Sequence, residues 1–187
     1  MESLAHPVAA VAAPAVEPDM PLITEARSAH VQAMQVIYAH YVQTSICTME
    51  ELAPGEAEMH RRHDALRREG LPWLVALDRA QVVGYAYAGR YRPRVGYGGT
   101  VETSIYIHPE HHGRGLGQLL LEALIRDCQS LGLRQMVAVI VRDPETQGSI
   151  RLHQRLGFRQ AGVLEQVGRK FGRSLDTLLM QRSLCAA

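Results

Sequence analysis

The fold is decided by residues 105–118, which read Ile-Tyr-Ile-His-Pro-Glu-His-His-Gly-Arg-Gly-Leu-Gly-Gln. The β-branched and aromatic start is typical of a strand, and the leucine-rich repeat that begins at Leu116 is typical of a long amphipathic helix. At such a strand-to-helix turn, successive N–H groups face one concavity and the helix dipole adds partial positive charge. The stretch therefore predicts a diphosphate site, to which Arg114 would add charge.

The glycine spacing argues against two common nucleotide motifs. No Lys-Ser or Lys-Thr pair follows the glycines, so the turn is not a Walker loop. The spacing Gly-x-Gly-x-Gly, after a strand in mid-chain, does not fit a dinucleotide-binding fingerprint either. Taken alone, a glycine triplet would favour a plain strand–helix connection that contains flexible glycines.

Outward from this turn, the periodicities predict one α/β domain with the order β-α-α-β-β-β-α-β-α-β-β. The predicted strands cover residues 22–24, 73–77, 82–91, 100–108, 136–141, 158–166 and 175–183, and the predicted helices cover 31–42, 55–69, 115–131 and 149–156. The wholly apolar strand 136–141 is expected to be buried on both faces. Residues 168–173 are expected to join the last two strands, and the arginines of 61–68 to lie on a solvated helix face.

Composition indicates an ordinary globular protein of 187 residues, with 47% hydrophobic and 21% charged residues. The net charge of +1 gives no reason to expect a nucleic-acid partner. No apolar run approaches the roughly 20 residues that span a bilayer. The three widely spaced cysteines argue against a disulfide framework and fit the cytoplasm. Residues 1–19, rich in Ala and Pro, are predicted to form a disordered extension, and residues 20–187 the folded domain.

The element order and the glycine turn resemble the GNAT acetyltransferase superfamily. Its motif, Arg/Gln-x-x-Gly-x-Gly/Ala, reads here as residues 112–117, with His112 where the family usually has Arg or Gln. The resemblance covers about residues 20–184. The stretches 99–107, 151–158 and 166–173 look more narrowly like the phosphinothricin and methionine sulfoximine N-acetyltransferases.

The resemblance implies the GNAT fold, an α/β (α+β) arrangement in which helices flank a mixed, mostly antiparallel twisted sheet. It also implies acetyl-CoA as cosubstrate. The backbone of the central strand would pair with the pantetheine arm, the turn would wrap the diphosphate, and Thr146 stands where the family has an asparagine. The implied cofactor residues are Ile105, Tyr106, Ile107, His112, Gly113, Arg114, Gly115, Leu116, Gly117, Gln118 and Thr146.

Amine acetylation needs a base, because an α-amine is largely protonated at neutral pH. Glu102 stands where the resembling enzymes have a glutamate and is the first candidate; His153, in a Leu-His-x-x-Leu-Gly-Phe match, is the second, as base or substrate contact. A backbone N–H of the central strand is the expected oxyanion donor. The general acid is left unassigned: Phe158 follows Gly157 where many GNAT enzymes have a tyrosine, and Tyr106 is only a weak alternative.

An amino-acid carboxylate or phosphinate calls for arginine, and Arg92 lies in the segment that resembles the family's substrate loop. The implied substrate residues are Arg92, Pro93, Arg94, Glu102, Thr103, Ser104 and His153. Met49 stands where relatives carry an aromatic residue, and Lys170 and Phe171 match a C-terminal segment that lies near the pocket and dimer contact in relatives. The resembling enzymes are homodimers, so a homodimer is expected. The spacing of His108, His111 and His112 suits no known zinc pattern, and no metal is expected.

Three other functions stay open. A GNAT enzyme with another acceptor, such as a polyamine, an aminoglycoside or a protein N-terminus, is one of them. The two arginines of the substrate loop argue against the first two acceptors, whose pockets should be acidic. The others are a non-catalytic CoA-binding regulatory module, which the presence of Glu102 and His153 disfavours, and a generic nucleotide-binding domain.

Overall fold

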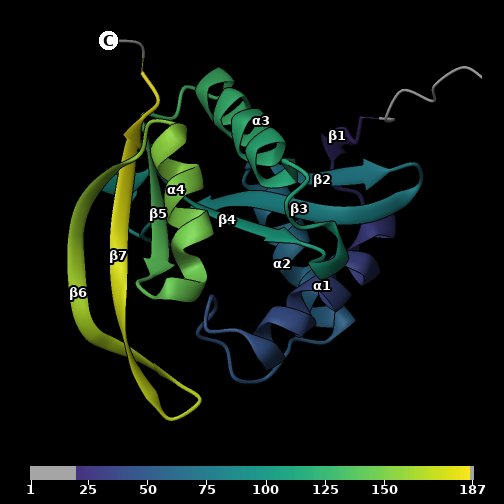
Figure 1. The fold of residues 1–187 in the computed structure, drawn as a ribbon. Coiled ribbons are helices and arrows are strands. Elements are labelled where there is room, and N and C mark those ends of the chain that lie inside the picture. The colour runs from purple at the N-terminus through teal and green to yellow at the C-terminus, as the bar shows by residue number, and fades with distance from the viewer. Residues whose placement is uncertain (1–19, 186–187) are drawn as a thin grey trace, which may run out of the picture.

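The computed structural model describes residues 20–185 (Figure 1), so the predicted extension 1–19 lies outside the described residues. The order of strands and helices is the one that the periodicities predict. The elements are β1 (Leu22–Glu25), α1 (Val31–Thr44), α2 (Glu56–Arg68), β2 (Trp73–Asp78), β3 (Gln81–Arg90), β4 (Thr100–Ile107), α3 (Leu116–Ser130), β5 (Gln135–Val141), α4 (Gln147–Arg155), β6 (Arg159–Lys170) and β7 (Arg173–Ser183).

The seven strands form one sheet in the order β1-β2-β3-β4-β5-β7-β6. Every neighbouring pair is antiparallel except β4 and β5, which are parallel, so the predicted mixed and mostly antiparallel sheet is confirmed. Successive side chains of a strand point to opposite faces. One face packs its aliphatic residues against α3 and α4, and the other packs an aromatic cluster against α1 and α2.

The two parallel strands separate halfway along their length. β4 pairs with β5 only from Thr100 to Thr103, against Gln135 to Ala138. Beyond this point the edge of β4 has no strand partner. The expectation that strand 136–141 is buried on both faces is therefore wrong: Val139, just past the last paired residue, is 41% exposed. Its apolar character fits a strand that lines an opening rather than one enclosed in the core.

The last two strands form a longer hairpin than the sequence predicts. β6 runs to Lys170 and β7 starts at Arg173, so the turn is Phe171–Gly172, and the expected connection over 168–173 is wrong. The hairpin reaches well past the end of β5 (Figure 1). An irregularity follows Leu164, where Gln166 takes a φ of 52° and its N–H donates to Asp176 Oδ1 at 3.0 Å. This bulge increases the local twist of the hairpin.

The tip of this hairpin is anchored to the loop that follows α1. The side chain of Lys170 is 1% exposed, and its Nζ donates to the carbonyl oxygens of Ser45 and Thr48, each at 2.8 Å. A buried ammonium group is tolerated only where its protons find acceptors. Met49 of the same loop lies against Gly168, where an added Cβ would approach the methionine methyl to 2.5 Å. The C-terminal hairpin and the loop 45–54 thus pack as one unit.

Candidate active site

A cavity of about 630 Å³ opens where β4 and β5 separate. It is bounded by the α3 N-terminus on one side, by α4 on another, and by the end of α1 with the following loop. The predicted site residues in its wall are Thr103, Ser104, Ile105, Tyr106, Ile107, His112, Gly113, Gly115, Leu116, Gly117, Gln118, Thr146 and His153. Most of the residues implied by the resemblance are therefore brought together at one opening.

The glycine turn presents unpaired backbone donors to this cavity. Gly113 and Gly115 have φ values of 76° and 77°, in the left-handed region that only glycine enters without strain. Within the described residues, the N–H groups of residues 113–117 have no backbone or side-chain acceptor. Five successive donors at the positive end of a 15-residue helix form a binding site for an anion. This geometry fits the predicted diphosphate site.

Arg114 is the exception among the turn residues. Its guanidinium lies 3.1 Å from Asp78 Oδ2 and donates to His111 Nδ1 at 2.7 Å. Arg114 is absent from the cavity wall. Asp78 at the end of β2 thus holds the side chain outside the wall in this structure, and the contribution of Arg114 to the diphosphate site stays a prediction.

Central strand β4 offers its free edge to the cavity from Ser104 onward, and Ile105, Tyr106 and Ile107 all lie in the wall. The carbonyl oxygen of Ile107 is already an acceptor, because the hydroxyl of Tyr41 on α1 donates to it at 2.5 Å. Burial raises the pKa of Tyr41 to about 12, so this donor stays protonated. The edge before Ile107 is thus the part left for an extended ligand.

Thr146 lies in the cavity wall, but its hydroxyl turns inward. Thr146 Oγ1 donates to the Val141 carbonyl oxygen at 2.5 Å and accepts from the N–H of Asp143 at 3.3 Å. The residue is 7% exposed. Its side chain therefore stabilises the start of α4, and only its methyl group is left to face a ligand.

His153 presents one bare ring nitrogen. Its Nδ1 lies 2.8 Å from the Ser149 carbonyl oxygen, which can only accept, so Nδ1 carries the proton. Nε2 is buried with no partner among the described residues, and the ring packs edge-on against Phe158 at 4.9 Å. Burial holds the pKa of His153 below its usual value, so the ring is neutral at pH 7. His153 is thus a neutral acceptor in the cavity wall.

Glu102 lies on the opposite face of the sheet from His153. On β4 the side chains of Val101 and Thr103 point to one face of the sheet and that of Glu102 to the other. Val101 belongs to the core beneath α3 and α4, so Glu102 faces the α1–α2 side. The structure does not bring the two candidate bases together, and Glu102 is absent from the cavity wall. Desolvation raises the pKa of the half-buried Glu102 carboxyl, and the charge of Arg92 partly offsets this.

The predicted substrate residues divide into two groups. Thr103 and Ser104 lie in the cavity wall, and Thr103 Oγ1 is buried without a hydrogen-bond partner among the described residues. Arg92, Pro93 and Arg94 are exposed and lie outside the cavity wall. The Arg92 guanidinium lies 4.9 Å from the centre of the Tyr91 ring. These three residues belong to an exposed loop beside the Glu102 face.

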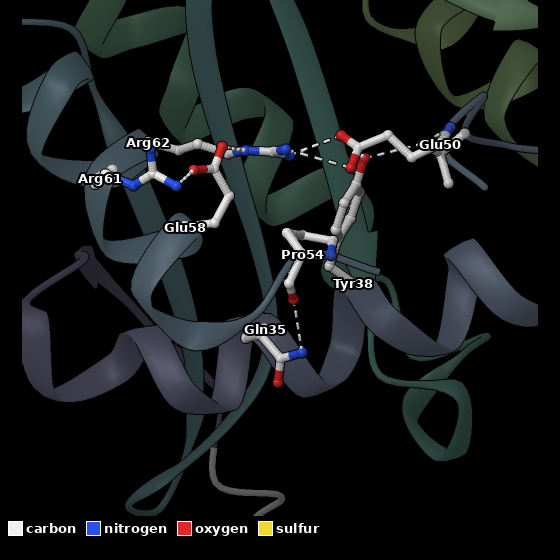
Figure 2. A network of polar contacts seen from close by, with 8 residues as sticks. Gln35, Tyr38, Glu50, Pro54, Glu58, Arg61 and Arg62 are labelled. Carbon is white, nitrogen blue, oxygen red and sulfur yellow. Dashed lines mark hydrogen bonds and ion pairs between the residues drawn. The ribbon is translucent and has the colours of Figure 1, made fainter. Parts of the chain in front are cut away.

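The loop between α1 and α2 is fixed by the polar network of Figure 2. Glu50 accepts from the Tyr38 hydroxyl at 2.9 Å and from Arg62 at 2.7 and 3.3 Å, while Arg62 also donates to Glu58 at 2.8 Å. Gln35 donates to the Pro54 carbonyl oxygen at 2.9 Å. The predicted solvated arginine face is therefore wrong for Arg62, which ties α2 to the loop.

A family model described as "Acetyltransferase (GNAT) family" matches residues 37–158, which include the β4–α3 turn and the whole cavity wall up to α4. The chain belongs to the GNAT acetyltransferase family. Enzymes of this family use acetyl-CoA, and acetyl-CoA is accordingly the cosubstrate of this GNAT enzyme.

Relatives with established names are similar over most of the chain. A phosphinothricin N-acetyltransferase of Alcaligenes faecalis is 47% identical over 82% of this chain and 78% of its own. An L-methionine sulfoximine/L-methionine sulfone acetyltransferase of Pseudomonas paraeruginosa is 42% identical over 87% and 94%. A phosphinothricin acetyltransferase of Sinorhizobium meliloti, solved with acetyl-CoA, has a TM-score of 0.84 and 42% identity over 88% of each chain.

The cavity of this GNAT enzyme has the donor set that acetyl-CoA requires. The unpaired N–H groups of residues 113–117 suit the diphosphate, and the free edge of β4 suits the amide-containing pantetheine arm. Thr103 Oγ1 and His153 Nε2 are buried polar atoms of the cavity wall that have no partner among residues 20–185, so both are free to bond to a ligand. When bound, acetyl-CoA supplies an activated acyl group as a thioester.

The wall residues that sequence reasoning missed include Tyr41, Ser45 and Cys47, which come from α1 and the loop after it. Tyr41 is part of the helical apolar stripe of α1, so its spacing indicates core packing and carries no sign of a polar role. Ser45 and Cys47 lie in a loop whose path depends on Lys170, more than 120 residues later. No helix in residues 20–185 has the length and apolarity to cross a membrane, and in the same range no group of three His, Cys, Asp or Glu side chains is placed to hold a metal ion.

Proposed function

We propose that this GNAT enzyme moves the acetyl group of acetyl-CoA to the α-amine of a small amino acid or analogue, of the phosphinothricin, methionine sulfoximine or methionine sulfone type. The relatives that are 47% and 42% identical carry these substrate names over more than four fifths of the chain. The observation that carries the proposal is the separation of β4 from β5. It opens the β4 edge beside Glu102 to the cofactor cavity, whose wall includes Ser104 and Tyr41 on the α1–α2 side.

In the proposed reaction, the amine approaches from the α1–α2 side and the thioester lies in the opening. Glu102 takes the ammonium proton, directly or through water, because burial raises the pKa of its carboxyl. The neutral nitrogen then attacks the thioester carbon, and a β4 backbone N–H stabilises the oxyanion. The carbon–sulfur bond breaks and CoA leaves as the thiolate. This is direct transfer in a ternary complex, with no acyl-enzyme.

We assign the acceptor's acid group to Arg92, beside Glu102. Arg92 lies close enough to lower the pKa of that carboxyl, so a substrate held by Arg92 would place its amine near Glu102. Thr103 Oγ1 and Ser104 are proposed as further polar contacts at the opening. His153, as a neutral acceptor on the other face, is proposed to orient a polar group in the cavity or to relay a proton.

We also propose a homodimer and a cytoplasmic location. β6 is an edge strand with almost every side chain exposed, including Val163, Leu164 and Val167 at 36%, 46% and 59%. A long edge strand with exposed apolar residues is the kind of surface that a second chain covers. The three cysteines carry free thiols, which fits a reducing compartment.

The test is release of CoA thiol by the purified protein with a panel of amines. The panel holds L-phosphinothricin, L-methionine sulfoximine, L-methionine sulfone, the common amino acids, spermidine, an aminoglycoside and a peptide with a free N-terminus. Turnover with one of the first three compounds, lost in Arg92→Gln but kept in the matched loop variant Arg94→Gln, supports the proposal and the role of Arg92. Turnover on spermidine, the aminoglycoside or the peptide alone would overturn the acceptor class.

A further inference from the structure

The diphosphate end of the cavity contains a contact between two side chains far apart in the sequence. His112, the residue immediately before the glycine turn, places its Nε2 2.7 Å from the hydroxyl oxygen of Tyr41 on α1 and 3.3 Å from the Ile107 carbonyl oxygen. Both side chains lie in the cavity wall. The two rings are nearly parallel, at 18°, with centres 6.4 Å apart.

The hydrogen-bond geometry determines which ring nitrogen carries the proton. The single Tyr41 hydroxyl proton is donated to the Ile107 carbonyl oxygen at 2.5 Å, so the Tyr41 oxygen is left to accept. His112 Nε2 must then be the donor, and Nδ1 is the bare nitrogen of the neutral ring. Among the described residues, no group bonds to His112 Nδ1. On protonation, the ring keeps its bond to Tyr41 and gains a positive charge.

We propose that Tyr41 is a positioning residue for the cofactor, and that it holds His112 as a titratable cationic contact for the CoA diphosphate. The two residues join helix α1 to the end of β4 and to the glycine turn, so α1 forms part of the diphosphate site. The proposal rests on acetyl-CoA as cosubstrate and is independent of the amine acceptor.

Several other charged or titratable groups face this corner. His40 and Tyr41 come from α1, Cys47 from the following loop, and Tyr106 from β4, while the segment before α3 contributes His108, His111 and Arg114. The far side of the same cavity wall contains Glu145, His153 and Arg155. His111 is the competitor nearest to His112 in the sequence, and it also lies in the cavity wall. Its Nδ1 accepts from the Arg114 guanidinium at 2.7 Å, so this nitrogen is already occupied.

The test is calorimetric binding of dephospho-CoA between about pH 5.5 and about pH 8, a range that spans the usual histidine pKa. Dephospho-CoA is chosen because it lacks the 3′-phosphate, whose own titration would fall in this range. Affinity of the wild-type protein is expected to rise about 5- to 10-fold as the pH falls, as expected for one added charge near a diphosphate. His112→Gln, which keeps a donor to Tyr41 but cannot be charged, should bind with no pH dependence. The matched variant His111→Gln should keep the wild-type dependence.

A double-mutant cycle tests whether the two residues act together. Tyr41→Phe removes only the hydroxyl and leaves the ring to pack on Tyr106, whose centre is 5.6 Å away. It should weaken dephospho-CoA binding about 3- to 10-fold at pH 6. The loss of affinity in the double variant Tyr41→Phe/His112→Gln should be clearly smaller than the product of the losses in the two single variants. Wild-type binding that is flat with pH, a pH dependence lost in His111→Gln instead, or multiplicative losses in the cycle would overturn the proposal. Because no amine is present, a wrong acceptor class leaves this result unchanged.

Discussion

The Nδ1 atom of His153 lies 2.8 Å from the carbonyl oxygen of Ser149, one turn earlier on α4. This bond fixes the ring as the Nδ1–H tautomer, with Nε2 buried and bare. Burial holds the pKa of His153 below its usual 6.5 in the folded protein. The unfolded chain takes up a proton near pH 6.5 while the folded chain does not, so His153 makes the protein less stable as the pH falls below 6.5.

Replacing His153 should therefore change how stability depends on pH. In His153→Gln, the loss of unfolding free energy between about pH 7.5 and about pH 5.5 should be smaller than in the wild type by about 1 kcal/mol. Urea unfolding at the two pH values measures this difference. Equal losses in the two proteins would mean that His153 is charged in the folded state. His60→Gln, at a half-exposed histidine of α2 outside the cavity wall, is the matched control for the substitution itself.

Glu102→Gln should lower kcat/KM about 10²- to 10⁴-fold if Glu102 is the base. Because burial raises the pKa of this carboxyl above 4.5, the acid limb of the wild-type kcat/KM profile should have an apparent pKa above 4.5. The variant should lose that limb, and its KM for acetyl-CoA should stay near the wild-type value. Steady-state kinetics across pH checks both points. Glu56→Gln, at a side chain 52% exposed on α2, is the matched control; an acid limb that persists in Glu102→Gln would assign the base elsewhere.

Thr146→Ala should affect stability more than cofactor binding. The hydroxyl bonds to Val141 and Asp143 within the chain, so its removal leaves buried backbone groups unsatisfied. The expected cost is about 1–3 kcal/mol of unfolding free energy. Chemical unfolding and the Kd of CoA measure the two effects separately. A Kd that weakens more than about 10-fold, with unfolding free energy unchanged, would show that the hydroxyl turns toward the ligand.

Gly115→Ala should weaken the diphosphate site through the backbone alone. No atom lies within 4 Å of a Cβ added at Gly115, but its φ is 77°. An alanine there costs about 1–2 kcal/mol or shifts the turn, and a shifted turn no longer aims its N–H groups together. Thermal unfolding and CoA binding should both be impaired. Gly96→Ala, which has equal space and no positive φ, should be close to neutral; equal effects at the two sites would contradict this explanation.

The sequence predicts those parts of the molecule that depend on local pattern. The turn at residues 105–118 combines strand, glycines and helix within one short segment, and its position in the structure agrees with the prediction. Val139 was misjudged because an apolar strand that lines an opening has the same composition as one buried on both faces. The direction of the Arg114 side chain depends on its ion pair with Asp78, 36 residues earlier in the chain. A local sequence pattern cannot predict such a long-range pair.

The same reason explains why Tyr41 was missed. Its helical spacing is that of a core residue, and its polar partners, Ile107 and His112, lie more than 60 residues later. Glu102 and His153 were predicted as individual residues, but their placement on opposite faces depends on which helices cover each face of the sheet. The sequence can thus nominate candidate site residues, whereas the face of the sheet on which each residue lies depends on long-range packing.

The anchoring of the loop 45–54 by Lys170 has a consequence for the order of folding. The two hydrogen bonds span 125 and 122 residues, so they are among the least local contacts of the chain. At about 5–20 residues synthesised per second, the start of the loop is made roughly 6 to 25 seconds before Lys170. The wall that contains Ser45 and Cys47 therefore reaches its final form only at the end of synthesis. A nascent chain that has completed β1 to α4 holds the cofactor turn but lacks the lysine that fixes this wall.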